Sequence, residues 1–123
     1  MSTEKNKALV LRYLHEAWEK GNPEAIDELC AERFTFNVVD DHKPMRGGRE
    51  ELKQRIARTH GYAKNLQMTV HETLAEGDRV ALRFTYDALV EDKPLKLAAV
   101  MFVHLINGKI NEYWYYDQEV TSG

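Results

Sequence analysis

The second half of the chain alternates between apolar and polar residues over four stretches that are separated by turn signals. Strict alternation places successive side chains on opposite faces of a β-strand, and Asn-Gly or Gly-Asp between two such stretches favours a hairpin. These residues therefore predict four consecutive antiparallel strands. In chain order, the stretches and turns are 66–74, the turn Glu76-Gly77-Asp78, 80–87, the turn Glu91–Pro94, 95–106, the turn Asn107-Gly108-Lys109 and 110–117.

The first half of the chain predicts three helices and one strand. Apolar residues recur there at helical spacing, and Gly21 and Gly61 stand where C-terminal caps are expected. Asn22-Pro23 is typical of a helix start, with an N-cap followed by proline at the first helical position. The predicted elements are a helix at 6–20, a helix at 23–30, a strand at 33–39, a loop at 40–48 and a helix at 49–60.

The predicted order α-α-β-α-β-β-β-β defines an α+β fold in which the helices pack on one face of a mainly antiparallel sheet. A length of 123 residues suits one domain. We therefore treat residues 1–123 as a single domain.

Composition excludes several classes of partner. The chain has 17 Lys and Arg against 20 Asp and Glu and no basic cluster, which argues against nucleic-acid binding. Its apolar runs are far shorter than the roughly 20 residues that span a bilayer, and its polar start resembles no signal peptide. The single cysteine, Cys30, excludes an internal disulfide and fits a reducing compartment. We expect a cytoplasmic protein with no membrane or nucleic-acid partner.

The strand predicted at 96–106 is apolar on both faces, and three helices can cover only one of them. The last strand places Ile110, Trp114 and Tyr116 on the face opposite Tyr113 and Tyr115. A second copy of the chain is the simplest cover for the outer face. The sequence thus predicts a homodimer formed around Phe102, Trp114 and Tyr116.

Four segments of the chain resemble the SnoaL-like polyketide cyclases. They are Leu9–Trp18, Gly21–Leu29, Gly77–Phe84 and Asn107–Asp117, and the resemblance covers about residues 5–119. This family belongs to a superfamily that also includes ketosteroid isomerase, limonene epoxide hydrolase and nuclear transport factor two. The resemblance implies a cone-like α+β barrel, in which a curved sheet wraps a long helix around a pocket.

The resemblance also implies that a small apolar molecule binds between the first helix and the inward face of the sheet. Tyr13 matches the helix tyrosine that donates a hydrogen bond in ketosteroid isomerase. The expected ligand-binding residues are Trp18, Phe34, Phe36, Val38, Leu82, Phe84, Tyr86, Met101, Val103 and Tyr113.

The chain departs from the catalytic pattern of these relatives. The proton-shuttling aspartate of the isomerase corresponds to Val38, and its second oxyanion acid corresponds to Met101 or a neighbour. The aspartate of the polyketide cyclase and one aspartate of the epoxide hydrolase both correspond to Tyr115. None of the three familiar active sites is intact.

Other residues of the predicted pocket could carry acid–base chemistry. Proton abstraction beside a carbonyl needs a base and a hydrogen-bond donor for the developing oxyanion. Tyr13 and Tyr115 are the candidate donors. Asp40 or Asp117 is the candidate base, because each carboxyl lies two residues beyond an inward-facing residue of its strand and is expected on the same face. The alternative roles are structural: Tyr13 in the core, Asp40 solvated in a loop, and Asp117 hydrogen-bonded at a strand end.

No motif predicts a metal or a cofactor. The chain lacks His-Glu-x-x-His, and the adjacent residues Asp40, Asp41 and His42 are badly spaced to converge on one ion. It also lacks a phosphate-binding glycine loop and a Gly-x-Ser-x-Gly nucleophile motif.

Two functions remain open. The first is cofactor-independent acid–base chemistry on a mainly apolar carbonyl compound such as a polyketide, terpenoid or steroid-like molecule, by an isomerase, a cyclase or a related lyase or hydrolase. The second is a non-catalytic ligand-binding or accessory dimeric domain of the same fold, since the usual aspartates are absent.

Overall fold

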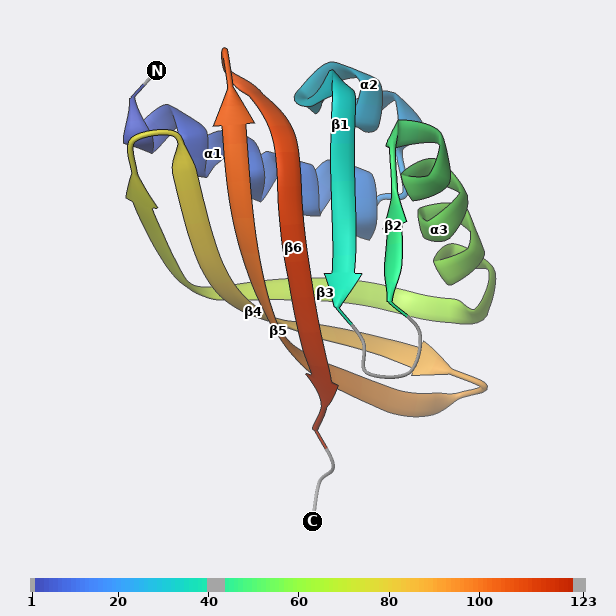
Figure 1. Cartoon of the computed structure of the whole chain (residues 1–123). Helices are drawn as coiled ribbons and strands as arrows, with labels where there is room; N and C mark the ends of the chain where they lie inside the picture. The colour runs from blue at the N-terminus through green and yellow to red at the C-terminus, as the bar shows by residue number, and fades with distance from the viewer. Residues whose placement is uncertain (1, 40–43, 121–123) are drawn as a thin grey trace.

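The computed structural model describes residues 2–39 and 44–120, in which three helices cover one face of a six-stranded sheet (Figure 1). A π-helical segment, η1, continues the first helix. The elements in chain order are α1 (Thr3–Tyr13), η1 (Leu14–Glu19), α2 (Pro23–Leu29), β1 (Cys30–Val39), β2 (Met45–Gly47), α3 (Arg49–Tyr62), β3 (Ala63–Glu76), β4 (Arg79–Val90), β5 (Lys93–Ile106) and β6 (Lys109–Glu119).

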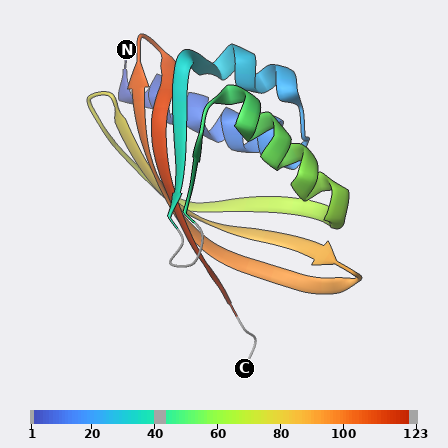
Figure 2. The same cartoon turned by 45° about the vertical axis from the view of Figure 1, so that its right-hand side comes forward.

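The strands are arranged in the order β2-β1-β6-β5-β4-β3. Strands β3 to β6 form the predicted antiparallel meander, and β1 then pairs in parallel with β6. Figure 2 shows the strong curvature of the sheet and all three helices on its concave side. The sheet does not close, because β2 and β3 are its free edges. The predicted α+β class and cone are thus confirmed, and the barrel is an open one.

Two hairpins have the backbone geometry that their sequences favour. Asn107 and Gly108 have φ values of 51° and 76°, and Glu91 and Asp92 have values of 53° and 63°. Positive φ at both central residues defines the type I′ turn, whose twist matches that of the flanking strands. The Asn-Gly pair adopts this conformation easily, whereas Glu91 adopts it against its steric preference.

The structure differs from the sequence prediction in three local features. The predicted loop at 40–48 contains the short strand β2, which pairs antiparallel with β1. Helix α3 continues through Gly61 to Tyr62, since a single glycine costs only about 1 kcal/mol in a helix. The helix predicted at 6–20 changes to π-helical hydrogen bonding at Leu14, and the Lys20 amide donates to the His15 carbonyl at 3.0 Å.

The core lies between the helices and the concave face of the sheet. Tyr13 and Val10 of α1 are fully buried there against Phe36 of β1 and Val103 of β5. On the convex face, by contrast, Phe102 is 43% exposed and Tyr116 is 48% exposed, while Trp114 is half-buried. Strand β5 is therefore apolar on both faces, as predicted, and only its concave face is covered in the single chain.

A β-bulge corrects the predicted orientation of Ile110. The register changes between the pairs His104–Glu112 and Leu105–Ile110, so β6 carries one extra residue there. An extra residue reverses the alternation of faces. Ile110 consequently points into the core with 0% exposure, and the prediction that it shares a face with Trp114 was wrong.

No helix in the described part of the chain is long and apolar enough to cross a membrane.

The position of Ile110 at the bulge leads to a testable prediction for the free energy of unfolding. We expect Ile110→Ala to lower the free energy of unfolding by about 2–5 kcal/mol, because it leaves a cavity in a fully buried site. Urea denaturation measures the change. Leu74→Ala is the control: that side chain is 67% exposed, and its truncation should change stability by about 0.5 kcal/mol or less. Equal losses for the two variants would contradict the assigned register.

Candidate functional site

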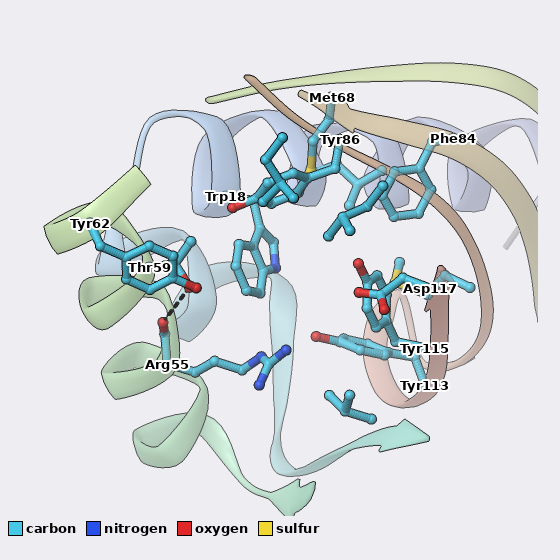
Figure 3. A pocket seen from close by; sticks show the side chains of 15 residues that line it. Trp18, Arg55, Thr59, Tyr62, Met68, Phe84, Tyr86, Tyr113, Tyr115 and Asp117 are labelled. Atoms are coloured by element: carbon cyan, nitrogen blue, oxygen red, sulfur yellow. Dashed lines mark hydrogen bonds between the residues drawn. The ribbon is translucent and has the colours of Figure 1, made fainter. Parts of the chain in front are cut away.

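A cavity of about 170 Å³ opens between η1, α3 and the concave face of the sheet (Figure 3). Its wall is mostly apolar and aromatic, as is usual for small-molecule sites. The lining residues are Leu14, Trp18, Val38, Arg55, Thr59, Tyr62, Met68, Phe84, Tyr86, Leu95, Leu97, Met101, Tyr113, Tyr115 and Asp117.

The parallel pairing of β1 with β6 forms one wall of the cavity. Tyr115 lies beside Val38 of β1 on one side and beside Met101 of β5 on the other. Tyr113 and Asp117 lie two residues before and after Tyr115 on the same face of β6. Three polar side chains therefore follow one another along a single strand, from the buried end of the cavity to its mouth.

A chain of hydrogen bonds orients the Tyr113 hydroxyl. The Trp18 indole Nε1 donates to the Tyr13 Oη at 3.0 Å, and the Tyr13 and Tyr113 hydroxyl oxygens are 2.7 Å apart. Tyr13 is fully buried, so its own proton needs an acceptor, and Tyr113 Oη is the acceptor within reach. Donation from Tyr13 to Tyr113 satisfies the Tyr13 proton, and because Tyr113 lines the cavity, its own proton can then reach a molecule there.

The π-helical turn makes this chain of hydrogen bonds feasible. Residues five apart lie on different sides of an α-helix, but a π-helix closes its hydrogen bonds at this spacing and brings such residues close together. Trp18 thus reaches Tyr13 although they are five residues apart. The turn is held in place by the His60 Nε2, 2.5 Å from the Trp18 carbonyl oxygen, and by Glu19, which accepts from the Met68 amide at 2.8 Å.

Arg55 brings a positive charge into the cavity. It lies on α3, is half-buried, and points with Trp18 toward Tyr113 and Tyr115 (Figure 3). Its Nη1 contacts the Met45 Sδ at 3.3 Å. Asp117 lies across the cavity from Arg55, with an exposed side chain at the mouth.

The tyrosines of the cavity remain protonated well above neutral pH. Burial raises the pKa of Tyr113, and burial together with the adjacent Asp117 carboxylate raises the pKa of Tyr115. Burial also raises the pKa of Tyr86 to about 12. The Arg55 charge opposes the rise at all three phenols, because it favours their anions. At neutral pH these three phenols are neutral, and the charged groups of the lining are the Arg55 guanidinium and the Asp117 carboxylate.

Many of the residues expected from the sequence do line the cavity. Two candidate catalytic residues, Tyr115 and Asp117, are in its wall. So are the expected ligand-binding residues Trp18, Val38, Phe84, Tyr86, Met101 and Tyr113.

The other expected residues have different positions. Tyr13 lies behind Tyr113, with the two ring centroids 5.7 Å apart, and does not reach the cavity. Four further side chains are buried in the core instead of in the cavity wall, namely Phe34, Phe36, Leu82 and Val103. They lie where side chains of α1 fill the cone, so they support the wall from behind. Asp40, with Asp41 and His42, lies outside the described residues.

Sequence reasoning missed the contribution of α3. Arg55, Thr59 and Tyr62 all line the cavity and follow one another at i, i+4 and i+7. This spacing marks one face of a helix. A polar stripe of this kind beside the apolar positions Leu52 and Ile56 was the available signal, but nothing in the sequence indicates that the stripe faces a cavity.

Within residues 2–39 and 44–120, no group of three or more His, Cys, Asp and Glu side chains is placed to hold a metal ion.

A comparison with protein families matches the SnoaL-like domain to residues 10–113. The chain belongs to the SnoaL-like family. The resemblance stated from the sequence is therefore confirmed. A comparison with curated proteins gives no match.

Solved structures share the fold of this SnoaL-like domain. A proposed SnoaL-like polyketide cyclase from Jannaschia sp. CCS1 has a TM-score of 0.81 and 18% identity, over 94% of this chain and 87% of that chain. An LEH-like epoxide hydrolase from M. tuberculosis has a TM-score of 0.78 and 16% identity, over 94% of this chain and 84% of that chain. A third structure is a protein from Catenulispora acidiphila DSM 44928 with a ketosteroid isomerase-like fold, in complex with trimethylamine. It has a TM-score of 0.76 and 23% identity, over 88% of this chain and 83% of that chain. At these identities the likeness shows the fold alone.

The buried phenols predict a stability that falls at high pH. Below pH about 10, Tyr86 is protonated in both the folded and the unfolded chain. Between pH 10.0 and about 12 the unfolded chain loses this proton first, so the free energy of unfolding decreases as pH rises. We expect Tyr86→Phe to make this decrease shallower in urea denaturation at pH about 9 and about 11. Tyr116→Phe, in a 48% exposed ring, is the control, and equal slopes for wild type and Tyr86→Phe would refute the expectation.

Proposed function

We propose that this SnoaL-like domain catalyses cofactor-independent acid–base chemistry on a mainly apolar carbonyl compound. A polyketide-like, terpenoid or steroid-like molecule has the required character. One observation carries the proposal: the oriented Tyr113 hydroxyl and the Asp117 carboxylate lie on one strand and face the same apolar cavity.

In the proposed reaction, Asp117 takes a proton from the carbon next to the substrate carbonyl. The C–H electron pair moves into a new carbon–carbon double bond, and the carbonyl electrons move to the oxygen, which becomes an enolate. Tyr113 donates a hydrogen bond to this oxygen as its charge develops. If the substrate has a β,γ double bond, the enolate is a dienolate, and return of the proton from Asp117 to the γ-carbon gives the conjugated isomer. If the enolate carbon instead attacks a second carbonyl, a ring closes and the new alkoxide takes the proton from Asp117.

The surroundings suit these roles. Side chains such as Met68, Phe84 and Leu97 make most of the wall apolar, and hydrogen bonds to an oxyanion are stronger in such a site than in water. Tyr115 lies next to Asp117 on the same face of β6, and in the proposed reaction its hydroxyl orients the carboxylate. Tyr13 and Trp18 act through Tyr113 and are positioning residues.

Hydrogen–deuterium exchange of a bicyclic ketone tests the proposal and does not require the natural substrate. We expect the protein to accelerate exchange of the α-protons of 2-tetralone in D2O, measured by proton NMR. Asp117→Asn should reduce the rate by about 10²–10⁴-fold, as expected for loss of a general base. Tyr113→Phe should reduce it by about 10²–10³-fold, as expected for loss of an oxyanion donor.

Asp92→Asn is the matched control, because it makes the same change in an exposed turn and should leave the exchange rate unchanged. If Asp117→Asn exchanged the protons as fast as the wild type, Asp117 would not be the base. Saturable binding of 2-tetralone without any exchange would instead support the non-catalytic binding function.

We also propose that two copies of the chain associate through the convex face of the sheet. Val100 is 48% exposed there, beside the exposed Phe102 and Tyr116, so the single chain leaves a row of apolar side chains in water. We expect Trp114→Glu to shift a dimer to a monomer in sedimentation or size-exclusion measurements, because it buries a charge in the contact. A wild-type monomer would refute the dimer, and a variant that stays dimeric would place the contact elsewhere.

A further inference from the structure

The acid–base mechanism proposed above leaves one charged side chain of the cavity without a role. Arg55 reaches the cavity from α3, on the side opposite Tyr113 and Asp117 (Figure 3). A guanidinium remains charged at every physiological pH and presents up to five N–H donors in one plane. Removing such a charge from water is costly unless it finds partners inside the site.

Two contacts describe how Arg55 is placed beside the cavity. Arg55 lies near the middle of the 14-residue helix α3, and Thr59 Oγ1 donates to its backbone carbonyl at 2.9 Å. The Met45 Sδ, 3.3 Å from Nη1, holds the other end of the side chain. Helix α3 thus carries the backbone of Arg55, and the contact with Met45 of β2 marks where its guanidinium lies.

The described residues around Arg55 do not supply the anion that a guanidinium favours. Its hydrogen-bond partner among them is a thioether sulfur, which is a weak acceptor. The nearby phenols of Tyr86, Tyr113 and Tyr115 are protonated at neutral pH. The Asp117 carboxylate is exposed at the mouth, across the cavity from Arg55. The inner part of the cavity thus combines a positive charge with hydrogen-bond donors.

We propose that the ligand of this cavity carries a carboxylate, which pairs with Arg55 while the apolar body of the ligand packs against Trp18, Met68 and Leu97. Guanidinium and carboxylate are both planar and pair through two parallel hydrogen bonds. Arg55 is then a specificity-determining residue, and Tyr113 and Asp117 remain free for the reacting carbonyl. The inference rests on the proposed function for the chemistry, but the carboxylate site itself involves binding alone.

A pair of aromatic probes of the same shape tests the inference. 2-Naphthoate carries a carboxylate, and 2-naphthamide replaces it with a neutral group of equal size. We expect isothermal titration calorimetry at neutral pH to show at least tenfold tighter binding of 2-naphthoate, which corresponds to about 1.4 kcal/mol. Arg55→Met should abolish this preference, and Arg55→Lys should keep part of it, because the charge remains without the planar fork.

Arg58→Met is the matched control, since Arg58 lies one turn further along α3 with an exposed side chain and should keep the full preference. Circular dichroism and thermal unfolding verify that each variant is folded, and Arg55→Lys replaces Arg55→Met should the latter fail to fold. Three results would each overturn the inference: absence of 2-naphthoate binding, equal binding of the two probes, or a preference that persists without Arg55.

These outcomes are separate from those of the exchange experiment. A carboxylate preference without any α-proton exchange would refute the proposed catalysis and leave the inference standing. Exchange of 2-tetralone without a carboxylate preference would refute the inference about Arg55 and leave the proposed catalysis standing.

Discussion

The hydrogen bond between Tyr13 and Tyr113 joins the first helix to the last strand, and the rest of the site depends on it. It spans 2.7 Å between residues that are 100 positions apart in the chain. Both rings are buried, so breaking the bond would leave polar groups without partners in an apolar core. It links α1 to β6 inside the cone, and donation from Tyr13 leaves the Tyr113 proton for the cavity.

The geometry around this bond explains how one small sheet provides both a solid core and a cavity. Tyr113 is the boundary between the two. On one side of it, Tyr13 and Phe36 fill the cone, and the ring centroids of Phe36 and Tyr113 are 6.3 Å apart. On the other side, the helix has become π-helical and turned Trp18 toward Tyr13, so that α3 and not α1 forms the facing wall. The cavity lies between η1, α3 and the sheet, beyond the end of α1.

The charged residues of this cavity do not lie at the positions that the resemblance in sequence suggests. The resemblance to related enzymes implies carboxylates at Val38 and Tyr115, and here those positions carry an isopropyl group and a phenol. The described charges of this cavity are instead Asp117, at the mouth, and Arg55, on the facing helix. The fold alone therefore does not specify the function of this cavity, because one scaffold can carry different polar groups.

The sequence by itself determined the elements and most of the sheet. Alternation and turn residues are local signals, and pairs such as Asn107-Gly108 constrain the backbone directly. The same parity identified Tyr113, Tyr115 and Asp117 as one face of one strand. Parity failed at Ile110, because a bulge reverses it and leaves no clear mark in the sequence.

Only the tertiary structure decided which inward residues face the cavity and which fill the core. Tyr13 and Tyr113 have the same residue type and are both buried, yet only Tyr113 lines the cavity. Arg55 has the local pattern of a solvated helical residue, and its place opposite Asp117 follows from the packing of α3 beside β1 and β3. Contacts between distant segments depend on how whole elements pack, and the local patterns of a single sequence do not specify them.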